Sequence, residues 1–188
     1  MPNWQKVFSG KIWQIQQKHL PDSRIFERAI RAPGSRIIVV RNGKILLQRE
    51  KRHELAGKTD IRLPGGKVFD TLEDFEAFQG DIVEASRQSI SQELLEEAGI
   101  VVNSENLNYL GVDFLGATVS WDLHYWIADN VEISQIGAKY HESEDLEIEG
   151  NFWADFDEVR KIVLDEDTFS ESRSAIALLR FINESEAK

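Results

Sequence analysis

Two short apolar runs in the first third of the chain flank the dipeptide Asn42-Gly43. The runs are Arg36–Val40 and Lys44–Gln48, and both are rich in Val, Ile and Leu. Asn-Gly favours the positive φ angles of a tight two-residue turn, so it is a strong short-range signal of a β-hairpin. The pattern therefore predicts two antiparallel strands joined at Asn42-Gly43.

Further along the chain, the apolar period changes to that of a helix. Ile90, Leu94 and Ala98 recur at four-residue intervals, and Gly99 follows directly, as expected of the residue that ends a helix. Strands are predicted at residues 107–114, 119–128 and 147–153. The middle strand is predicted because its alternate residues are apolar, namely Trp121, Leu123, Tyr125 and Ile127.

Helix-start patterns occur twice near the C-terminus, at Asp155–Glu158 and Thr168–Glu171, each before an apolar run. At the other end, residues 4–31 alternate in short pieces that are broken by Ser9-Gly10 and Pro21–Ser23. These breaks predict a small meander of strands. Together the elements predict an α+β fold, mostly strands around few helices.

Composition narrows the class of protein. A chain of 188 residues with 41% hydrophobic and 29% charged residues fits one globular domain with a small extension. The absence of cysteine excludes disulfides, a Cys-based zinc site and a thiol nucleophile. A net charge of −11 argues against a nucleic-acid partner, and no stretch approaches the roughly 18 apolar residues of a membrane span. We therefore expect a cytoplasmic protein with no nucleic-acid or membrane partner.

The helix that ends at Gly99 carries a cluster of carboxylates. Glu93 precedes Glu96 and Glu97 by three and four residues, so the three share one patch of the helix surface. Such a patch is ordinarily a solvated face. Alternatively, it binds a hard cation such as Mg²⁺, which takes carboxylate oxygens and reaches substrate phosphates. Upstream, Leu63–Lys67 contains two glycines, which permit a tight turn and a close approach to a ligand.

These residues resemble the signature of the Nudix hydrolases, G-x5-E-x7-R-E-U-x-E-E-x-G-U, in which U is aliphatic. From Glu84 to Ile100 every fixed position matches except one, where Gln92 replaces the family's Arg. Gly66 and Glu84 are 18 residues apart instead of six, an insertion of twelve. Segments outside the signature are similar to the ADP-ribose and nucleoside-diphosphate-sugar pyrophosphatases of this family. They are residues 26–34, 48–52, 142–147, 157–158 and 174–179.

The resemblance implies a Nudix fold, in which a mixed β-sheet is sandwiched between helices in an α/β/α arrangement. It also implies an N-terminal β extension at residues 1–33 that forms a homodimer, followed by a Nudix domain at residues 34–188 with an inserted segment at about 69–81. In the insertion, Leu72, Phe75 and Phe78 are spaced by three residues, which predicts a short helix with an apolar edge. The insertion is either a lid beside the metal site or a decoration packed on the surface.

The same resemblance implies a metal site and a catalytic base. The implied ligands of one to three Mg²⁺ ions, with Mn²⁺ as a substitute, are the carbonyl of Gly65 and the carboxylates of Glu93, Glu96, Glu97 and Glu144. Glu96 and Glu97 are thereby catalytic residues, and Glu142 matches the catalytic base. For Glu142 and Glu144 the alternative is an ordinary acidic surface loop.

Candidate substrate-binding residues combine cations for phosphate with an aromatic ring for a nucleobase. They are Arg28, Arg49, Arg52 and Trp121. The alternative is that the cations are solvated strand ends and that the aromatic side chain packs in the core. Gln92 lacks the charge and the bidentate geometry of Arg, for which Arg87 is a candidate replacement. Arg62 stands where many relatives carry Glu.

Three functions are consistent with these features, and the first two have a small nucleotide as the substrate. The first is Mg²⁺-dependent cleavage of the pyrophosphate bond in a nucleoside diphosphate linked to a sugar or similar moiety, giving a nucleoside monophosphate and a phosphorylated product. The second is a nucleoside triphosphate pyrophosphatase. The third is a catalytically weak Nudix module that binds a nucleotide or a protein, which Gln92 and the insertion favour. The presence of Glu93, Glu96 and Glu97 favours an enzyme, because clustered like charges without a function are unfavourable.

Overall fold

A six-stranded mixed sheet is the centre of the computed structural model, which describes residues 3–129, 134–135 and 148–187. Its strands are β4 (Gly34–Arg41), β5 (Lys44–Arg52), β6 (Lys58–Arg62), β8 (Asn108–Asp113), β10 (Leu123–Asp129) and β12 (Ile148–Asp155). They lie in the order β12-β5-β4-β10-β8, and β6 pairs with β5. Strands β4 and β10 run parallel, whereas the other pairs are antiparallel.

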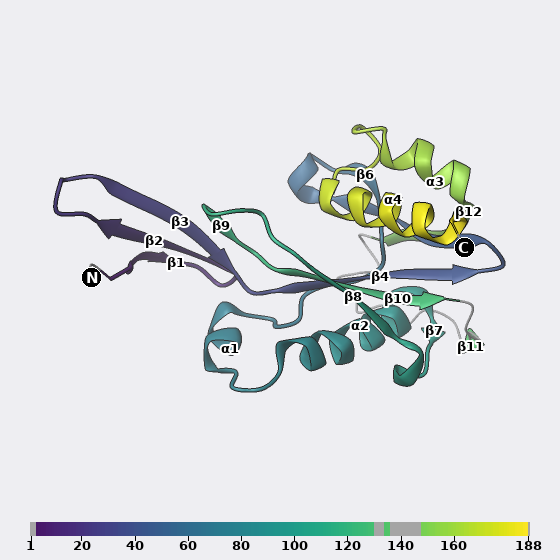
Figure 1. Cartoon of the computed structure of the whole chain (residues 1–188), viewed down its shortest axis with the longest axis horizontal. Helices are drawn as coiled ribbons and strands as arrows, with labels where there is room; N and C mark the ends of the chain where they lie inside the picture. Colours follow the sequence, from purple (N-terminus) through teal and green to yellow (C-terminus); the bar gives the residue numbers. More distant parts are fainter. Residues whose placement is uncertain (1–2, 130–133, 136–147, 188) are drawn as a thin grey trace.

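Helices cover both faces of this sheet (Figure 1). Helix α2 (Ile82–Ala98) lies on one face, and α3 (Phe156–Val163) and α4 (Ser172–Glu186) lie on the other. Successive side chains of a strand point to opposite faces. In β4, Ile37 and Val39 accordingly pack in the core beneath α2, whereas Ile38 and Val40 pack beneath α3 and α4. The predicted α/β/α arrangement is confirmed.

The N-terminal strands form a second sheet that extends away from the core (Figure 1). Strands β1 (Gln5–Ser9), β2 (Trp13–His19) and β3 (Ile25–Arg31) are an antiparallel meander, as predicted, and β9 (Val119–Ser120) adds to β3 in parallel. The remaining small elements are the pair β7 (Ile100–Val101) and β11 (Ser134–Gln135) and the 3-10 turns η1 (His53–Leu55) and η2 (Ser104–Asn106).

Two local predictions are confirmed at the level of backbone angles. Asn42 and Gly43 have φ angles of 53° and 70°, so they form the tight turn between β4 and β5. Helix α2 begins after Asp81, whose carboxylate accepts hydrogen bonds from the amides of Val83 (2.8 Å) and Glu84 (3.3 Å). It ends at Gly99, which has the left-handed conformation (φ 64°) that terminates a helix.

The single strand predicted at residues 119–128 is wrong, because the segment is divided between the two sheets. Strand β9 pairs with β3, and β10 pairs with β4. The chain passes between the sheets at Trp121 and Asp122, where the carbonyl of Asp122 accepts a hydrogen bond from the amide of Gly34 (2.9 Å). Trp121 therefore lies at the junction of the two sheets.

The helix start predicted at Thr168–Glu171 is also wrong. Helix α4 begins at Ser172, and the hydroxyl of Thr168 donates instead to Asp165 (2.7 Å) in the preceding turn. Glu171 occupies the N-cap but makes no side-chain cap bond, because its carboxylate binds an arginine of β4. In contrast, Asp155 and Glu158 form the predicted capping box at the start of α3.

The insertion contains the short helix predicted for it, α1 (Leu72–Ala77). Leu72 is buried, and the ring of Phe69 contacts those of Phe75 and Phe78 at centroid distances of 5.5 and 5.0 Å. No helix within the described ranges is long and apolar enough to cross a membrane.

Truncation of a buried side chain on α4 tests this packing. Leu178 is fully buried, whereas Ile176, two residues earlier on the same helix, is 45% exposed. We expect Leu178→Ala to lower the free energy of unfolding by about 2–5 kcal/mol, because it leaves a cavity in the core. Ile176→Ala is expected to change it by about 0.5 kcal/mol or less. Equal losses in urea denaturation would contradict this placement of α4.

Candidate functional site

The turn between β6 and the insertion packs directly against the acidic face of α2. Glu97 is 9% exposed, and its carboxylate accepts a hydrogen bond from the amide of Gly65 (3.0 Å). A Cβ atom at Gly66 would lie 1.9 Å from Oε1 of Glu93. Gly65 itself has a φ of 137°, and a Cβ there would lie 2.3 Å from the carbonyl oxygen of Ser35. The two glycines are therefore required for the turn to reach both carboxylates.

Burial and a neighbouring charge make Glu97 a weak acid. Desolvation, followed by the charge of Glu93, raises the pKa of Glu97 to about 8, although the amide of Gly65 and the charge of Arg36 act in the opposite direction. Two carboxylates four residues apart on one helix thus repel each other at a site of low solvent exposure. Such a pair is a suitable partner for a divalent cation.

The third carboxylate of the signature faces a different environment. Glu96 accepts a hydrogen bond from the amide of Gln92 (2.9 Å) and lines a second cavity on the far side of Glu93. Within the described residues, no three Asp, Glu or His side chains converge on one point as a complete metal site. Mg²⁺ commonly needs only one or two protein carboxylates, because waters and substrate phosphates complete its octahedron. The donor set of Glu93, Glu97 and the backbone of Gly65 fits that requirement.

Beside these carboxylates is a cavity of about 330 Å³, which we call the arginine cavity. Its side chains include cations, carboxylates and one indole ring. The residues that line it are Ile12, Arg31, Ala32, Pro33, Gly34, Arg36, Glu50, Arg52, Glu54, Arg62, Gly65, Gly66, Lys67, Glu93, Glu97, Trp121 and Ile148.

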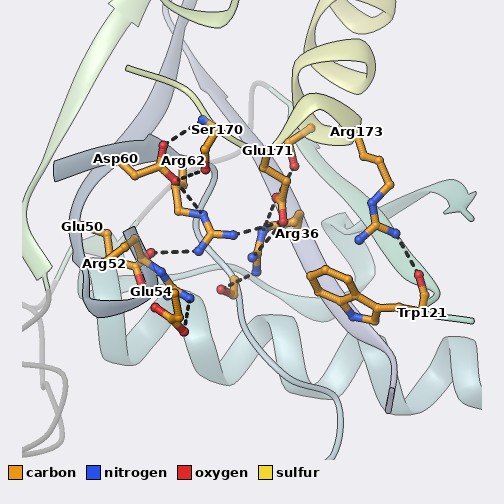
Figure 2. A network of polar contacts seen from close by, with 12 residues as sticks. Arg36, Glu50, Arg52, Glu54, Asp60, Arg62, Trp121, Ser170, Glu171 and Arg173 are labelled. Carbon is orange, nitrogen blue, oxygen red and sulfur yellow. Dashed lines mark hydrogen bonds and ion pairs between the residues drawn. The ribbon is translucent and has the colours of Figure 1, made fainter. Parts of the chain in front are cut away.

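A network of ion pairs fixes two of these arginines (Figure 2). The carboxylate of Glu171 pairs with Nε of Arg36 and Nη2 of Arg62, each at 3.0 Å; both arginines are buried, and the side chain of Glu171 is only 9% exposed. Burial by itself would raise the pKa of Glu171, but the charges of Arg36 and Arg62 outweigh it and hold that pKa well below its usual range. Arg62 also pairs with Glu50 (3.4 Å), which in turn binds Arg52. The wall of the cavity is therefore rigid and permanently charged.

Arg36 also connects this network to the turn. Its Nη1 donates a hydrogen bond of 2.6 Å to the carbonyl oxygen of Gly65, the atom assigned as a metal ligand by the resemblance. A carbonyl oxygen has two lone pairs, so one remains available for a second partner. Gly65 thus joins the carboxylate of Glu97 on α2 to the guanidinium of Arg36 on β4.

Arg31 is a cation that faces the cavity without an ion pair among the described residues. Its guanidinium lies over the ring of Trp121 at 4.3 Å, and Arg173 lies over the same ring at 4.4 Å. Arg173 also donates to the carbonyl of Trp121 (2.8 Å; Figure 2). Burial, then the positive charges of Arg36 and its neighbours, lowers the pKa of Arg31. The positive charges of the neighbouring arginines, which are the smaller cause of this shift, would attract an anion here.

The structure gathers some of the predicted substrate-binding residues and separates others. Arg52 and Trp121 line the arginine cavity. Arg28 is not among its lining residues; it stacks on Trp4 at 4.4 Å in the N-terminal sheet. Arg49 is also outside it, with its guanidinium over the ring of Phe152 at 4.0 Å. The predicted base and the predicted fifth ligand, Glu142 and Glu144, lie outside the described residues.

Three cavity arginines, Arg31, Arg36 and Arg62, were not predicted from the sequence as substrate-binding residues. The sequence signal for Arg36 is its charge at the start of the otherwise apolar run of β4. Arg31 carried no distinguishing local pattern. Arg87, the candidate replacement for the signature arginine, pairs with Glu84 at 2.8 Å.

A solved structure of a known protein has the same architecture. No protein-family model matches the sequence, and no curated protein matches it. The crystal structure of an ADP compounds hydrolase is similar over 97% of this chain and 90% of that one, with a TM-score of 0.69 and 16% sequence identity. The chain has the Nudix fold.

A second similar structure, a MutT NUDIX hydrolase from Burkholderia pseudomallei, has a TM-score of 0.49 and 23% identity, over 78% of this chain and 95% of that one. In this chain Glu93, Glu96 and Glu97 lie on α2, and each lines at least one of the two cavities.

The acidity of Glu97 predicts a pH-dependent stability in the absence of metal. Because the pKa of Glu97 is about 8 in the folded protein and near the ordinary glutamate value of 4.5 in the unfolded chain, stability is lost as the pH rises between these values. Glu97→Gln removes this loss. We expect the variant to gain stability relative to wild type in thermal melts from about pH 5 to about pH 8.5. The surface variant Glu105→Gln is the control, and a constant difference between Glu97→Gln and wild type would contradict the prediction.

Proposed function

We propose that the protein is a Mg²⁺-dependent Nudix hydrolase that cleaves the pyrophosphate bond of a nucleoside diphosphate linked to a sugar or similar moiety. The observation that carries the proposal is the contact of Glu93 and Glu97 with the Gly65-Gly66 turn, at the edge of a cavity that contains four arginines. The structural likeness to an ADP compounds hydrolase supports it.

The metal-binding part of the proposal rests on donor chemistry. Glu93, Glu97 and the carbonyl of Gly65 would hold Mg²⁺, or Mn²⁺ in its place, with Glu96 beside them and Glu144 as a further ligand assigned by the resemblance. The ion neutralises phosphate charge and lowers the pKa of a bound water when it is present. With a pKa of about 8, the carboxyl group of Glu97 is protonated at neutral pH, so it must lose this proton when the ion binds.

The chain's own residues bind and orient the substrate. Arg31, Arg36 and Arg52 present fixed positive charge to the diphosphate. The indole of Trp121 offers an aromatic wall to the nucleoside. Water adds to one phosphorus, the bond from that phosphorus to the bridging oxygen breaks, and Glu142 accepts the proton of the water. The products are a nucleoside monophosphate and a phosphorylated second product.

The N-terminal extension, residues 1–33, belongs to the proposal as a homodimer interface. Its sheet exposes large apolar side chains on β1 and β3, which a second copy of the chain would cover. They are Val7, Phe8, Ile25 and Phe26.

Hydrolysis assays test the proposed reaction. The panel contains ADP-ribose, ADP-glucose, GDP-mannose, a dinucleoside diphosphate and nucleoside triphosphates, each with Mg²⁺. We expect a diphosphate-linked compound to give two phosphorylated products, and Glu97→Gln to lower kcat on the order of 10²–10³-fold because charge stabilisation is lost. Glu105→Gln, the same change on the surface, is expected to leave kcat unchanged.

Other results would overturn this function. Release of inorganic pyrophosphate from triphosphates alone would make the protein a triphosphate pyrophosphatase. Nucleotide binding without any turnover would make it a binding module on the Nudix fold.

A further inference from the structure

A second cavity lies between α2 and the insertion, and we call it the insertion cavity. Its volume is about 520 Å³. The residues that line it are Lys67, Val68, Phe69, Asp70, Phe78, Ala85, Gln88, Ser89, Gln92, Glu93 and Glu96. The insertion forms one wall of this cavity, which is partly open, and Glu93 and Glu96 of α2 lie on the opposite wall.

Aromatic packing holds the insertion wall in a defined position. The ring of Phe78 lies 5.0 Å from that of Phe69, and Phe69 also contacts Phe75. A Cβ at Gly80 would lie 2.5 Å from Cζ of Phe78, so the glycine lets the ring fold back against the backbone. Phe69 and Phe78 therefore present fixed ring surfaces to the cavity.

The two ends of the insertion are tied to different parts of the fold. The amide of Leu72 donates to the carbonyl of Lys11 (3.0 Å), and the carboxylate of Glu76 accepts from Gln14 (2.7 Å), so α1 is bound to the N-terminal sheet. At the other end, Asp81 caps α2. The hydroxyl of Ser89 donates to the carbonyl of Lys67 (2.9 Å), which closes the opposite wall. The insertion is therefore fixed to the rest of the fold at both ends, unlike a loop that only packs on the surface.

The insertion cavity and the arginine cavity meet at two side chains. Glu93 and Lys67 line both of them. A diphosphate held at this junction, by a carboxylate-bound cation and by an ammonium group, would place one of its ends in each cavity. The arrangement fits a substrate with a group on both sides of the diphosphate.

The charge of the insertion cavity identifies the kind of group that fits it. Its carboxylates are Asp70, Glu93 and Glu96, and its cation is Lys67. This balance disfavours additional phosphates. The side-chain amides of Gln88 and Gln92 donate to and accept from hydroxyl groups, and the carboxylate of Asp70 accepts from them. The rings of the wall offer apolar faces. Hydroxyl partners beside flat apolar surfaces suit a polyhydroxylated, uncharged ring.

We infer that the insertion cavity binds the non-nucleotide half of the substrate, a sugar joined to the diphosphate, and that the insertion sets specificity for it. This assignment rests on the proposed diphosphate hydrolysis and adds the location and chemistry of the second group. Phe78 and Gln88 determine its affinity, while the nucleoside occupies the arginine cavity.

Substrates that differ only on the far side of the diphosphate test the assignment. The probes are ADP-ribose and GDP-mannose, each assayed beside the β-methyl ester of the same nucleoside diphosphate. Phe78→Ala and Gln88→Ala are expected to lower kcat/KM for the hydrolysed sugar compound by about tenfold, mainly through KM. The methyl esters, which leave the cavity empty, should change by about twofold or less. Glu73→Ala, on the exposed surface of α1, is the control for the insertion and is expected to change neither.

The outcomes separate this inference from the proposed function. The inference would be overturned if the variants lowered kcat/KM equally for the sugar compound and its methyl ester, or if neither variant changed kcat/KM for the sugar compound. Either result would leave the proposed hydrolase function standing. A third outcome is that wild type hydrolyses a dinucleotide faster than the sugar compounds and that Phe78→Ala raises the KM for that dinucleotide. This result would assign the cavity to a second nucleoside and would also overturn the inference. Failure of wild type to hydrolyse any probe would overturn both. Thermal melts check that the variants are folded, and the exposed Gln88 keeps the test independent of the packing of Phe78.

Discussion

The hydrogen bonds of a single glycine organise this site. The amide of Gly65 donates to the buried carboxylate of Glu97, and its carbonyl accepts from the buried guanidinium of Arg36. Neither contact is available to a residue with a side chain, because a Cβ at this position would collide with β4. The next residue, Gly66, leaves the space that the carboxylate of Glu93 fills. This turn thus fixes α2 against the sheet and brings carboxylates of α2 close to the guanidinium of Arg36.

The remaining polar groups extend from that turn in two directions. On one side, Glu171 holds Arg36 and Arg62 so that they cannot leave the cavity wall. Buried ion pairs of this kind add little net stability, but breaking one leaves an uncompensated buried charge, so they maintain a single arrangement. On the other side, Glu93 faces both cavities. Carboxylates at the junction and cations along the wall are complementary to a divalent cation bound to a diphosphate.

Local patterns predicted the parts of this structure that local forces determine. The turn at Asn42-Gly43 and the end of α2 at Gly99 follow from backbone preferences, and the helical period places Glu93 and Glu97 on one face. The start of α4 was predicted wrongly because Glu171 binds Arg36, a residue 135 positions away, instead of capping its own helix. Long-range contacts of this kind, including those that bring Arg31 to the cavity, have no signal in local sequence. The insertion was predicted as a short helix, but the cavity behind it depends on its attachment to the N-terminal sheet.

Proton release on metal binding tests the central claim, that Glu93 and Glu97 hold a divalent cation. In calorimetric titrations with Mg²⁺ or Mn²⁺ near pH 7, buffers of different ionisation enthalpy reveal how many protons leave the protein. Because the pKa of Glu97 is about 8 without metal, the account predicts release of roughly one proton per ion bound. Glu97→Gln should lose both the proton release and most of the affinity. Metal binding to wild type without proton release, or unchanged binding to Glu97→Gln, would contradict the account.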